Sequence, residues 1–393
     1  MRIALFTDSN IHFLDGVARI IQELIKYIQA RPEHSLVVFH RDSDKPDKED
    51  FGGNVTAHGI AAPCVKIPGY NAYPILYLKS PKKQIRNILK DNPPHISITI
   101  TPYIPRGIGN SSLYVSKKLN KPLVGSFDVP LSWYSEYYIQ KLFKISLIAK
   151  FLRWRVKANM KKYRRCNMIL VPSISMNDYV KNLYENMDTF LFHRAVDSES
   201  FNPTHRSLNF RDEYKIENKI VLIFVGRLAL EKNLSVLTET FTTLKLKYAN
   251  IALLMIGDGP ERESIEKQNL PDLIFTGALF GDDLRRAYAS ADIFVYPSVV
   301  DAGPMAILEA MASGLPAVVF KGGGTHEVVT DGETGYVVED NEQFEGSLEQ
   351  LIRDDRLRST MKEKARKHAE SRDWNRVWDE ILEALGDTIE KFD

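Results

Sequence analysis

The sequence has few of the features that mark secreted, membrane-spanning or metal-bound proteins. Its two cysteines, Cys64 and Cys166, lie far apart without metal-ligand spacing, which fits a reducing compartment and excludes a disulfide framework. No apolar run approaches the ~18 residues that cross a bilayer. The first residues, MRIALFTD, have no small-residue cleavage site after an apolar run, so we expect a buried strand there and no signal peptide. A cytoplasmic protein is the simplest expectation.

An excess of one charge is also lacking. The 52 basic and 51 acidic residues leave a formal net charge of +1, so no global basic field predicts a nucleic-acid partner. The chain of 393 residues is longer than one domain with a single hydrophobic core usually is. Domains usually have about 100 to 200 residues, so we expect two of them.

Short apolar runs bounded by turn residues recur along the whole chain, as is typical of strands buried on both faces. They are RIALFT, SLVVFH, ISITIT, PLVGSF and MILVPS in the first half, and IVLIFVG, IALLMIG, LIFTG, DIFVYPS and PAVVF in the second. Stretches of helical period lie between them, such as VARIIQELIKYI, NLSVLTETFTTLKLKYA and DDLRRAYASA. Alternating strands and helices predict two doubly wound, Rossmann-like α/β domains with a cleft between them.

Composition suggests where the domains divide. The polar stretch 197–218 separates the two series of strands, and we expect it to be the linker. The domains are then 1–197 and 198–372, and the tail 373–393 predicts a final helix. Residues 41–54 are rich in charge and are expected to form a loop.

Basic residues follow one of the predicted strands directly, at the sheet edge where doubly wound domains bind their ligands. Arg227 comes one residue after the strand-ending Gly226, and Lys232 lies five residues further at the start of a helix. A guanidinium fork and a compact ammonium together suit a diphosphate, although two surface cations are the alternative. Gly16, between the first strand and the first helix, either lets backbone amides approach an anion or is an ordinary loop glycine.

The stretch SVVDAGPMAILEAMASGLP predicts a short helix over PMAILEAMAS. Pro304 fits its first turn and Gly314 fits its C-terminal cap. The first amides of this helix, near Met305 and Ala306, offer partial positive charge to a phosphate. Asp301 then lies on the loop just before the helix.

Glu309 lies more than one turn inside the same helix, among apolar neighbours. A buried carboxylate is costly unless it is paired or hydrogen-bonded. The hydroxyl groups of a ribose are one source of such bonds. A solvent-facing position on the helix is the alternative.

Four stretches of the second half resemble the C-terminal half of retaining family-4 glycosyltransferases, which have the GT-B fold. They are GRLALEKN, LLMIGDGPER, FTGALFGDDLRRAYASADIFVYPS and DAGPMAILEAMASGLPAVVFKGGGTHEVVTDGETGYVVED. The resemblance continues upstream through DGVARI, ILVPSISMNDY and HRAVDSESFNP. The layout is similar to sulfoquinovosyl diacylglycerol synthases and to bacterial mannosyl- and glucosyltransferases that act on lipids.

This resemblance implies a role for each singled-out residue. Arg227 and Lys232 match the cations that hold the donor diphosphate, and Gly16 matches the glycine that lies over the same phosphates. Glu309 matches the acid that binds the ribose. Asp301 stands where the family usually has glutamate, the residue that binds hydroxyl groups of the donor sugar.

The sequence departs from the family at two places. Ala302-Gly303-Pro304 replaces a stretch that more often ends in Phe-Gly, so the sugar pocket is expected to differ. The amides after Gly303, in the segment of Pro304 and Met305, are expected to face the phosphates. The family also commonly has a histidine near Phe127 or Asp128. Asp128 either binds a sugar hydroxyl or orients the acceptor, or it caps a helix that begins near Ser132.

The resemblance implies transfer of a hexose from a nucleotide sugar with retention of configuration. We expect a UDP-sugar ahead of a GDP-sugar as the donor, which is a substrate, and no cofactor. The domain 1–197 is expected to bind the acceptor, 198–372 the nucleotide sugar, and the helix 373–393 to pack back on the first domain. No metal-ligand cluster is visible in the sequence, so we expect metal independence. A nucleotide-sugar-binding protein without catalysis is the alternative.

Residues 141–165 form the most basic segment of the chain. KLFKISLIAKFLRWRVKANMKKYRR has ten basic residues, no acid and many interleaved apolar side chains. It is either an amphipathic helix on an anionic membrane, where each cation contributes ~1 kcal/mol, or a helix packed on the sheet with a solvated basic side. The first interpretation places the protein at the inner face of the membrane with a lipid or lipid-linked acceptor. A soluble acceptor is the alternative.

Overall fold

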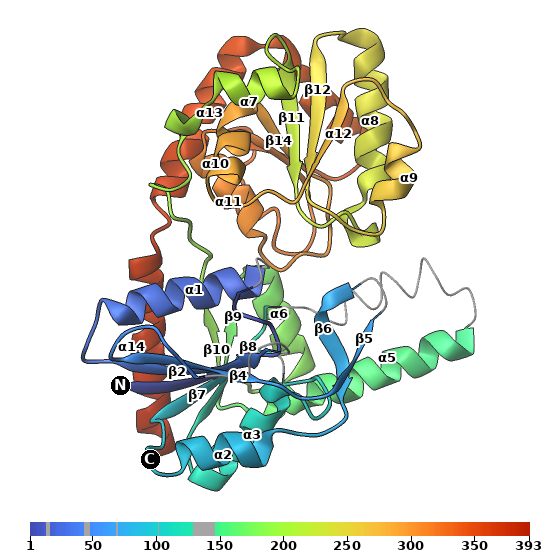
Figure 1. The fold of residues 1–393 in the computed structure, drawn as a ribbon. Helices are drawn as coiled ribbons and strands as arrows, with labels where there is room; N and C mark the ends of the chain where they lie inside the picture. The colour runs from blue at the N-terminus through green and yellow to red at the C-terminus, as the bar shows by residue number, and fades with distance from the viewer. Residues whose placement is uncertain (13–15, 43–47, 68–69, 101, 129–145) are drawn as a thin grey trace. The chain divides into compact units, whose positions relative to one another are not determined.

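The computed structural model describes residues 1–12, 16–42, 48–67, 70–100, 102–128 and 146–393. These residues form two compact α/β units (Figure 1). Unit 1 consists of Met1–His193 together with Trp374–Asp393, and unit 2 consists of Arg194–Asp373. The sequence placed the divisions after residues 197 and 372, and the structure places them after 193 and 373.

Unit 1 is built on one large sheet whose strands run in the order β10-β9-β8-β7-β1-β2-β4-β3. The strands are β1 (Arg2–Phe6), β2 (Ser35–Arg41), β3 (Lys48–Asp50), β4 (Val55–Ile60), β7 (Ile96–Thr99), β8 (Leu123–Ser126), β9 (Met168–Val171) and β10 (Thr189–Leu191). All neighbours pair in parallel except β3 and β4. A separate antiparallel pair consists of β5 (Cys64–Ile67) and β6 (Tyr70–Tyr77).

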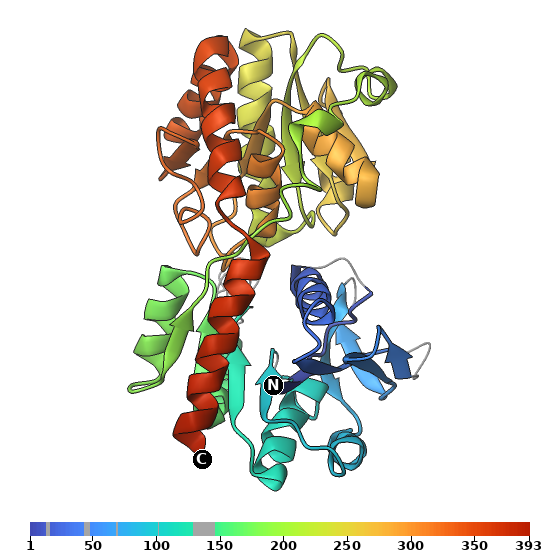
Figure 2. The same cartoon turned by 90° about the vertical axis from the view of Figure 1, so that its left-hand side faces the viewer.

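Among the helices of unit 1, α1 and α14 each bury an apolar face. The helices are α1 (Gly16–Gln29), α2 (Lys82–Leu89), α3 (Ile108–Leu119), α5 (Ser146–Met160), η1 (Lys161–Arg165), α6 (Ile174–Leu183) and α14 (Trp374–Phe392). Figure 2 shows α14, in red, lying along the strands of unit 1. Trp374 and Trp378 stack at 5.6 Å on its buried face, and the Tyr27 hydroxyl of α1 donates to Asp379. These contacts hold the last helix to unit 1.

Unit 2 has a fully parallel sheet in the order β13-β12-β11-β14-β15-β16. Its strands are β11 (Ile220–Val225), β12 (Ile251–Ile256), β13 (Leu273–Gly277), β14 (Ile293–Tyr296), β15 (Ala317–Phe320) and β16 (Gly335–Val338). Every residue of β12 is buried, as expected for a strand covered by helices on both faces. Numbered by their sequence within unit 2, the strands lie in the order 3-2-1-4-5-6, which is the Rossmann order. The strands are added on one side of β11 up to β13 and on its other side from β14 onward, so the strand order reverses between β11 and β14.

The helices of unit 2 cover both faces of this sheet (Figures 1 and 2). They are η2 (Pro203–His205), α7 (Leu208–Glu213), η3 (Leu230–Lys232), α8 (Leu234–Lys247), α9 (Arg262–Glu266), α10 (Gly281–Ser290), α11 (Met305–Ala312), α12 (Asn341–Arg353) and α13 (Asp355–Glu370). The two doubly wound domains predicted from the sequence are therefore confirmed.

Two expectations about loops are wrong. The stretch 197–218 is part of unit 2 and not a linker, because its polar residues cap short helices: Asn202 caps η2 and Ser207 caps α7. The charged stretch 41–54 contains the strand β3, which pairs antiparallel with β4. A short charged strand at a sheet edge looks like a loop in sequence.

Candidate functional site

The predicted cations and acids of unit 2 gather at the strand-order reversal of its sheet. Arg227 follows β11 and Asp301 follows β14, and these two strands are neighbours. The carboxyl ends of the strands on either side of such a reversal leave the crevice where open α/β sheets bind ligands. The topology thus brings together two stretches that are far apart in sequence.

Lys232 and Asp301 form a buried ion pair at this edge. The Lys232 ammonium donates to Asp301 Oδ1 at 2.7 Å, to Oδ2 at 2.8 Å and to the Tyr296 hydroxyl at 2.9 Å. An ammonium has three N–H groups, so these three bonds use its full donor capacity. Tyr296 in turn donates to Asp301 Oδ2 at 3.0 Å. The sequence predicted both charged residues but neither their pairing nor the tyrosine.

Tyr296 is the last residue of β14 and is fully enclosed. Burial and the neighbouring Asp301 carboxylate raise the pKa of its hydroxyl well above the ordinary value. The tyrosine therefore keeps its proton and acts as a neutral hydrogen-bond donor to Asp301. Its ring stacks on Phe224 of β11 at 5.8 Å, which fixes the hydroxyl between the two strand ends.

The backbone of Asp301 is fixed by the loop after β15. Gly324 donates its N–H to the Asp301 carbonyl at 2.7 Å. Gly323 has a φ of +52°, and a Cβ on it would lie 2.2 Å from the same carbonyl oxygen. Both the left-handed backbone and the close approach require glycine there. Gly323 and Gly324 thus hold the loop that carries Asp301.

Arg227 lies beside the buried pair but reaches solvent, with 32% of its side chain exposed. Its Nη1 atom is 4.0 Å from Glu231 Oε1, and the Glu231 side chain is almost fully buried. The Ser298 hydroxyl donates to the Glu231 carbonyl at 3.2 Å, which ties η3 to the loop after β14. Sequence reasoning missed Glu231, although a buried acid between Arg227 and Lys232 was visible as part of the same motif.

The helix α11 begins at Met305, so Pro304 is the residue before the helix and not in its first turn. Pro304 has extended backbone angles, φ −73° and ψ 122°. Gly314 ends the helix as expected: its N–H donates to Met311 O at 2.9 Å and its φ is +78°. The backbone N–H groups of Met305 and Ala306 lie in the first turn of α11, where the helix dipole favours an anion, whereas Pro304 has no N–H.

Glu309 is buried in α11, so the solvent-facing alternative is wrong. The hydroxyl of Tyr288 in α10 donates to Glu309 Oε2 at 3.0 Å. The carboxylate therefore has a partner in the protein and does not depend on a ribose to be satisfied. A ribose role for Glu309 remains a prediction.

Of the two predicted site residues of unit 1, Asp128 lies at a strand end and Gly16 at the start of a helix. Asp128 follows β8, and its carboxylate accepts a hydrogen bond from Ser126. The helix that it was expected to cap, near Ser132, lies outside the described residues. Gly16 is the first residue of α1 and is exposed, and a Cβ on it would meet no heavy atom within 4 Å. The described residues of unit 1 thus impose no steric need for glycine at this position.

Sequence reasoning missed a second acid of unit 1, Asp8, which follows β1. Its carboxylate is buried and accepts from the amides of Ile108 at 2.7 Å and Gly109 at 3.1 Å. Asp8 thus caps α3 from across the sheet. The strand-ending TDSN was the available signal.

The basic segment 141–165 is described from residue 146 onward. It forms α5 and then the short helix η1, and Trp154 is 60% exposed. Arg155, Lys157 and Lys161 are also exposed. At the other end of the segment, the Tyr163 hydroxyl is buried and donates to Ser126 O at 2.9 Å. Among the described helices of the chain, none is long and apolar enough to cross a membrane.

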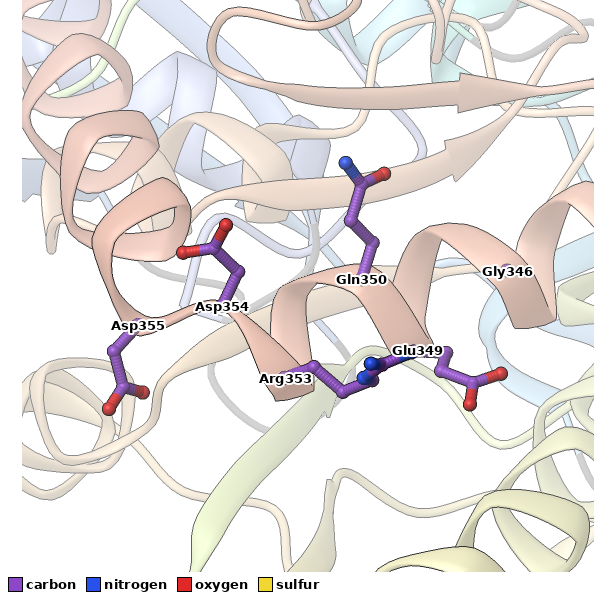
Figure 3. A pocket seen from close by; sticks show the side chains of 6 residues that line it. All are labelled: Gly346, Glu349, Gln350, Arg353, Asp354 and Asp355. Atoms are coloured by element: carbon purple, nitrogen blue, oxygen red, sulfur yellow. The ribbon is translucent and has the colours of Figure 1, made fainter.

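A surface pocket lies away from these residues, where α12 ends and α13 begins (Figure 3). It is lined by Gly346, Glu349, Gln350, Arg353, Asp354 and Asp355. Glu349 accepts from the Tyr248 hydroxyl at 2.7 Å, Gln350 accepts from the Tyr336 hydroxyl at 2.9 Å, and Asp354 caps α13. Helix capping and surface hydrogen bonds account for these side chains.

Comparison with known proteins gives one family. Residues 206–368 match the family model described as glycosyl transferases group 1. The chain is 32% identical over 390 residues to the sulfoquinovosyl transferase SQD2 of Arabidopsis thaliana, covering 95% of this chain and 71% of that protein. It is 27% identical over 394 residues to a GDP-mannose-dependent alpha-mannosyltransferase of Corynebacterium glutamicum, covering 99% and 89%. An alpha-monoglucosyldiacylglycerol synthase of Acholeplasma laidlawii is 23% identical over 378 residues, covering 93% and 92%.

Solved structures share the fold over nearly the whole chain. Sucrose-phosphate synthase from Thermosynechococcus elongatus matches with a TM-score of 0.77 at 16% identity, covering 99% of both chains. Anabaena HepE, solved in complex with UDP and glucose, matches with a TM-score of 0.72 at 15% identity, covering 98% of this chain and 99% of that one. At such low identity these likenesses show the fold alone.

Proposed function

The chain belongs to the group 1 glycosyltransferases of the GT-B fold, enzymes that transfer a sugar from a nucleotide sugar, and on this premise we propose that it moves a hexose from a UDP-sugar to a hydroxyl group of a lipid or lipid-linked acceptor. The observation that carries the proposal is the buried Lys232–Asp301 pair at the strand-order reversal of unit 2. A cation and an acid held side by side match the two chemically different parts of a nucleotide sugar, the diphosphate and the hexose.

We assign the diphosphate to the basic residues. Arg227 offers a partly exposed guanidinium fork, and Lys232 offers a compact charge fixed by its neighbours. The backbone N–H groups of Gly303 and Met305, on either side of Pro304, add the partial positive charge of a helix N-terminus. Because negative charge grows on the phosphate as it leaves, donors held in place beforehand lower the barrier. Gly16 of unit 1 is proposed to lie over the same phosphates.

Asp301 then binds hydroxyl groups of the hexose, Glu309 binds the ribose, and Asp128 binds a sugar hydroxyl or orients the acceptor. The acceptor oxygen attacks C1 of the hexose on the face that the diphosphate leaves, and its proton passes to the departing phosphate oxygen. The configuration at C1 is thereby retained. These steps use side chains and amides of the protein alone, so no metal or cofactor enters the proposed transfer.

Donor binding must exchange hydrogen bonds at Lys232. Its three N–H groups already contact Asp301 and Tyr296, so a phosphate oxygen can bind only when one of these contacts is released. Asp301 would then accept a hydrogen bond from a sugar hydroxyl group in place of the N–H bond that it lost. The proposal thus couples recognition of the phosphate to recognition of the sugar.

Membrane association is the second part of the proposal, and α5 supports it. Trp154 is exposed beside Arg155, Lys157 and Lys161, a combination suited to an anionic lipid surface. One relative is named for a lipid product, the alpha-monoglucosyldiacylglycerol synthase of Acholeplasma laidlawii. We propose that α5 holds the enzyme at the inner face of the membrane, where its acceptor lies.

The decisive experiment measures release of the nucleoside diphosphate from a panel of UDP-, GDP- and ADP-sugars. Each donor is tested with and without liposomes that carry diacylglycerol or phosphatidylinositol. We expect slow release from a UDP-sugar, faster release with one lipid, and loss of at least about 100-fold in kcat for Lys232→Ala. Lys321→Ala is the matched control, because Lys321 forms an exposed pair with Glu339 at 2.6 Å in the same unit.

Each other outcome has a defined meaning. Preference for GDP-mannose would replace the UDP-sugar and follow the mannosyltransferase relative. Binding of a donor without turnover under every condition would rule out the lipid transferase and leave a binding protein or a soluble acceptor. Asp301→Glu separates these two, since a working enzyme changes its rate or donor preference and a binding protein stays inactive.

The membrane part is tested separately by vesicle flotation. Reversing the charge of Arg155, Lys157 and Lys161 to glutamate is expected to abolish binding to anionic vesicles. The matched control reverses Lys83, Lys90 and Lys118, which are exposed cations elsewhere in unit 1. Equal binding by both triple variants would contradict the assignment of α5. Lys162 is left unchanged, because it donates to Tyr103 O at 3.2 Å and supports the fold.

A further inference from the structure

Three side chains from separate elements of unit 1 converge on one point. They are His12 in the turn after β1, His40 in β2 and Glu49 in the edge strand β3. Each offers one ligand atom, and these atoms lie within 4.8 Å of one another. We propose that His12, His40 and Glu49 bind a divalent transition-metal ion, with Zn²⁺ the best match.

His40 is the observation that points to a ligand. Its side chain is fully buried, and its Nδ1 lies 3.3 Å from the carbonyl oxygen of Arg41. Since a carbonyl only accepts, Nδ1 carries the proton and Nε2 carries the lone pair. Among the described residues this Nε2 has no hydrogen-bond partner. Metal-binding histidines have this arrangement, with one ring N–H donated to a backbone carbonyl and the other nitrogen directed at the metal.

The burial of this nitrogen also favours a ligand. A buried nitrogen without a partner is otherwise costly, and an ion would remove that cost.

The other two ligands are placed to close on this fixed nitrogen. His12 Nε2 lies 3.0 Å from Glu49 Oε1, and the two side chains are 48% and 34% exposed. Ligands bound at about 2.0–2.1 Å in tetrahedral geometry lie about 3.3 Å apart. The His12–Glu49 separation is already close to this value. The remaining separations shorten through small movements of the two exposed side chains.

The backbone that carries His12 is itself held in place. His12 N donates to Asn10 Oδ1 at 2.9 Å, and the Gln22 amide of α1 donates to the Ile11 carbonyl at 2.7 Å. Glu49 is paired through β3 to β4. The ion would therefore join the turn after β1 to two strands of the sheet.

The donor set selects the class of ion. Two imidazoles and one carboxylate suit Zn²⁺ and its neighbours in the first transition series, whereas Ca²⁺ and Mg²⁺ take oxygen ligands alone. Three protein ligands leave a fourth position for water. No sequence motif announces this site, because His40 lies 28 residues after His12 in a separate element. The site belongs to unit 1 and takes no part in the proposed transfer step.

The test uses the full chain after treatment with a chelator and removal of that chelator. Isothermal titration with Zn²⁺ is expected to give one site per chain, and Zn²⁺ is expected to raise Tm. His12→Gln and Glu49→Gln should each weaken Kd at least tenfold, and both positions are exposed enough for the fold to be kept. Co²⁺ should give the visible absorption of a tetrahedral site in wild type and lose it in both variants.

The control is His205→Gln, a partly exposed histidine of unit 2 outside the cluster. It should bind Zn²⁺ with the Kd of the wild type. Binding of less than one equivalent by the wild type would overturn the proposal and leave His12 and Glu49 as an ordinary ion pair. So would a Kd that is the same in the wild type and in both cluster variants.

Discussion

Two buried acids lie at opposite ends of the same strand, β14, and they are held in different ways. Asp292 precedes the strand and accepts from the Val221 amide at 3.0 Å and from Lys362 at 3.2 Å. Asp301 follows the strand, and its side chain contacts the side chains of Lys232 in η3 and Tyr296 at the end of β14. Asp292 thus ties a helix to the backbone of the sheet, whereas Asp301 belongs to groups that can exchange partners. The difference matches the rule that ligands bind outside the carboxyl ends of parallel strands.

The number of cations around each acid also differs between the two ends of β14. Besides Lys362, Asp292 faces Arg211 at 3.4 Å and Arg206 at 3.6 Å, so one acid serves three cations. Each arginine also donates to backbone carbonyls, Arg211 to Ser290 O at 2.6 Å among them. Such a network is satisfied within the protein. We therefore expect changes at Asp292 to affect stability and changes at Asp301 to affect ligand binding.

The largest effect is expected for Asp292→Ala. Removing the acid leaves three cations and a buried amide without their shared partner, which should lower the free energy of unfolding by about 3–5 kcal/mol. Urea unfolding measures this loss. The matched control is Asp355→Ala, because Asp355 pairs with Arg358 at the surface with 85% of its side chain exposed, and surface pairs contribute about 0–1 kcal/mol. A Kd for the donor that changes in folded Asp292→Ala would contradict a purely structural role.

A smaller effect with a specific rescue is expected for Asp301→Asn. The substitution leaves Lys232 without its counter-charge, which should lower the free energy of unfolding by about 1–3 kcal/mol. The diphosphate of a nucleotide supplies a new counter-charge. The nucleoside diphosphate should therefore raise Tm more in Asp301→Asn than in the wild type, as measured by thermal unfolding with and without the ligand. An equal rise in both proteins would separate Lys232 from the phosphate site.

A third prediction concerns acid unfolding. Burial alone would raise the pKa of Asp292, but Lys362, the Val221 amide, Arg206 and Arg211 outweigh it and hold this pKa below its ordinary value. A lowered pKa in the folded state means that the unfolded chain binds the proton more tightly. The contribution of Asp292 is therefore present above about pH 4 and is lost as the pH falls further.

Asp292→Asn checks this prediction, because the amide has no charge to lose. The difference in stability between wild type and variant should be constant from pH 7 to about pH 5 and shrink below about pH 4. Urea unfolding across this range measures it. A difference that stays constant down to about pH 2.5 would show that other carboxylates govern acid unfolding.

The smallest effect is expected for Tyr296→Phe. The ring and its stacking on Phe224 are kept, and only the hydroxyl between Lys232 and Asp301 is lost. One hydrogen bond contributes about 0.5–1.5 kcal/mol, so Tm should fall slightly. The freed N–H of Lys232 becomes available to phosphate, and the Kd for the nucleoside diphosphate should decrease or stay equal. A weaker Kd would show that Tyr296 itself contacts the ligand.

Much of the fold could be predicted from the sequence because its signals are local. Buried parallel strands such as β11 and β12 are continuous apolar runs, and α11 has proline before it and glycine after it. The strand-end positions of Arg227 and Lys232 followed from these runs. The linker was wrong because capping residues and linker residues are of the same types.

The parts of the site that depend on distant pairing could not be predicted. Lys232 and Asp301 are 69 residues apart, and only the order of the strands brings them together. The same holds for Glu309, whose partner Tyr288 comes from another helix. For His40, the informative feature is a missing hydrogen bond, which no sequence displays. Residue types in the sequence indicate which chemical groups are present, but the strand order and helix packing decide which of them are in contact.

The closed set of bonds at Lys232 has a consequence for discrimination between ligands. With Asp301 and Tyr296 in contact, the Lys232 ammonium is neutralised before any ligand arrives. A lone phosphate would gain the ammonium only by leaving the acid uncompensated. In a donor site of the kind proposed, an intact nucleotide sugar compensates both groups at once, and the spent nucleotide compensates one. The pair would then bind the intact nucleotide sugar more tightly than the nucleoside diphosphate, so that the nucleoside diphosphate dissociates once the sugar has been transferred.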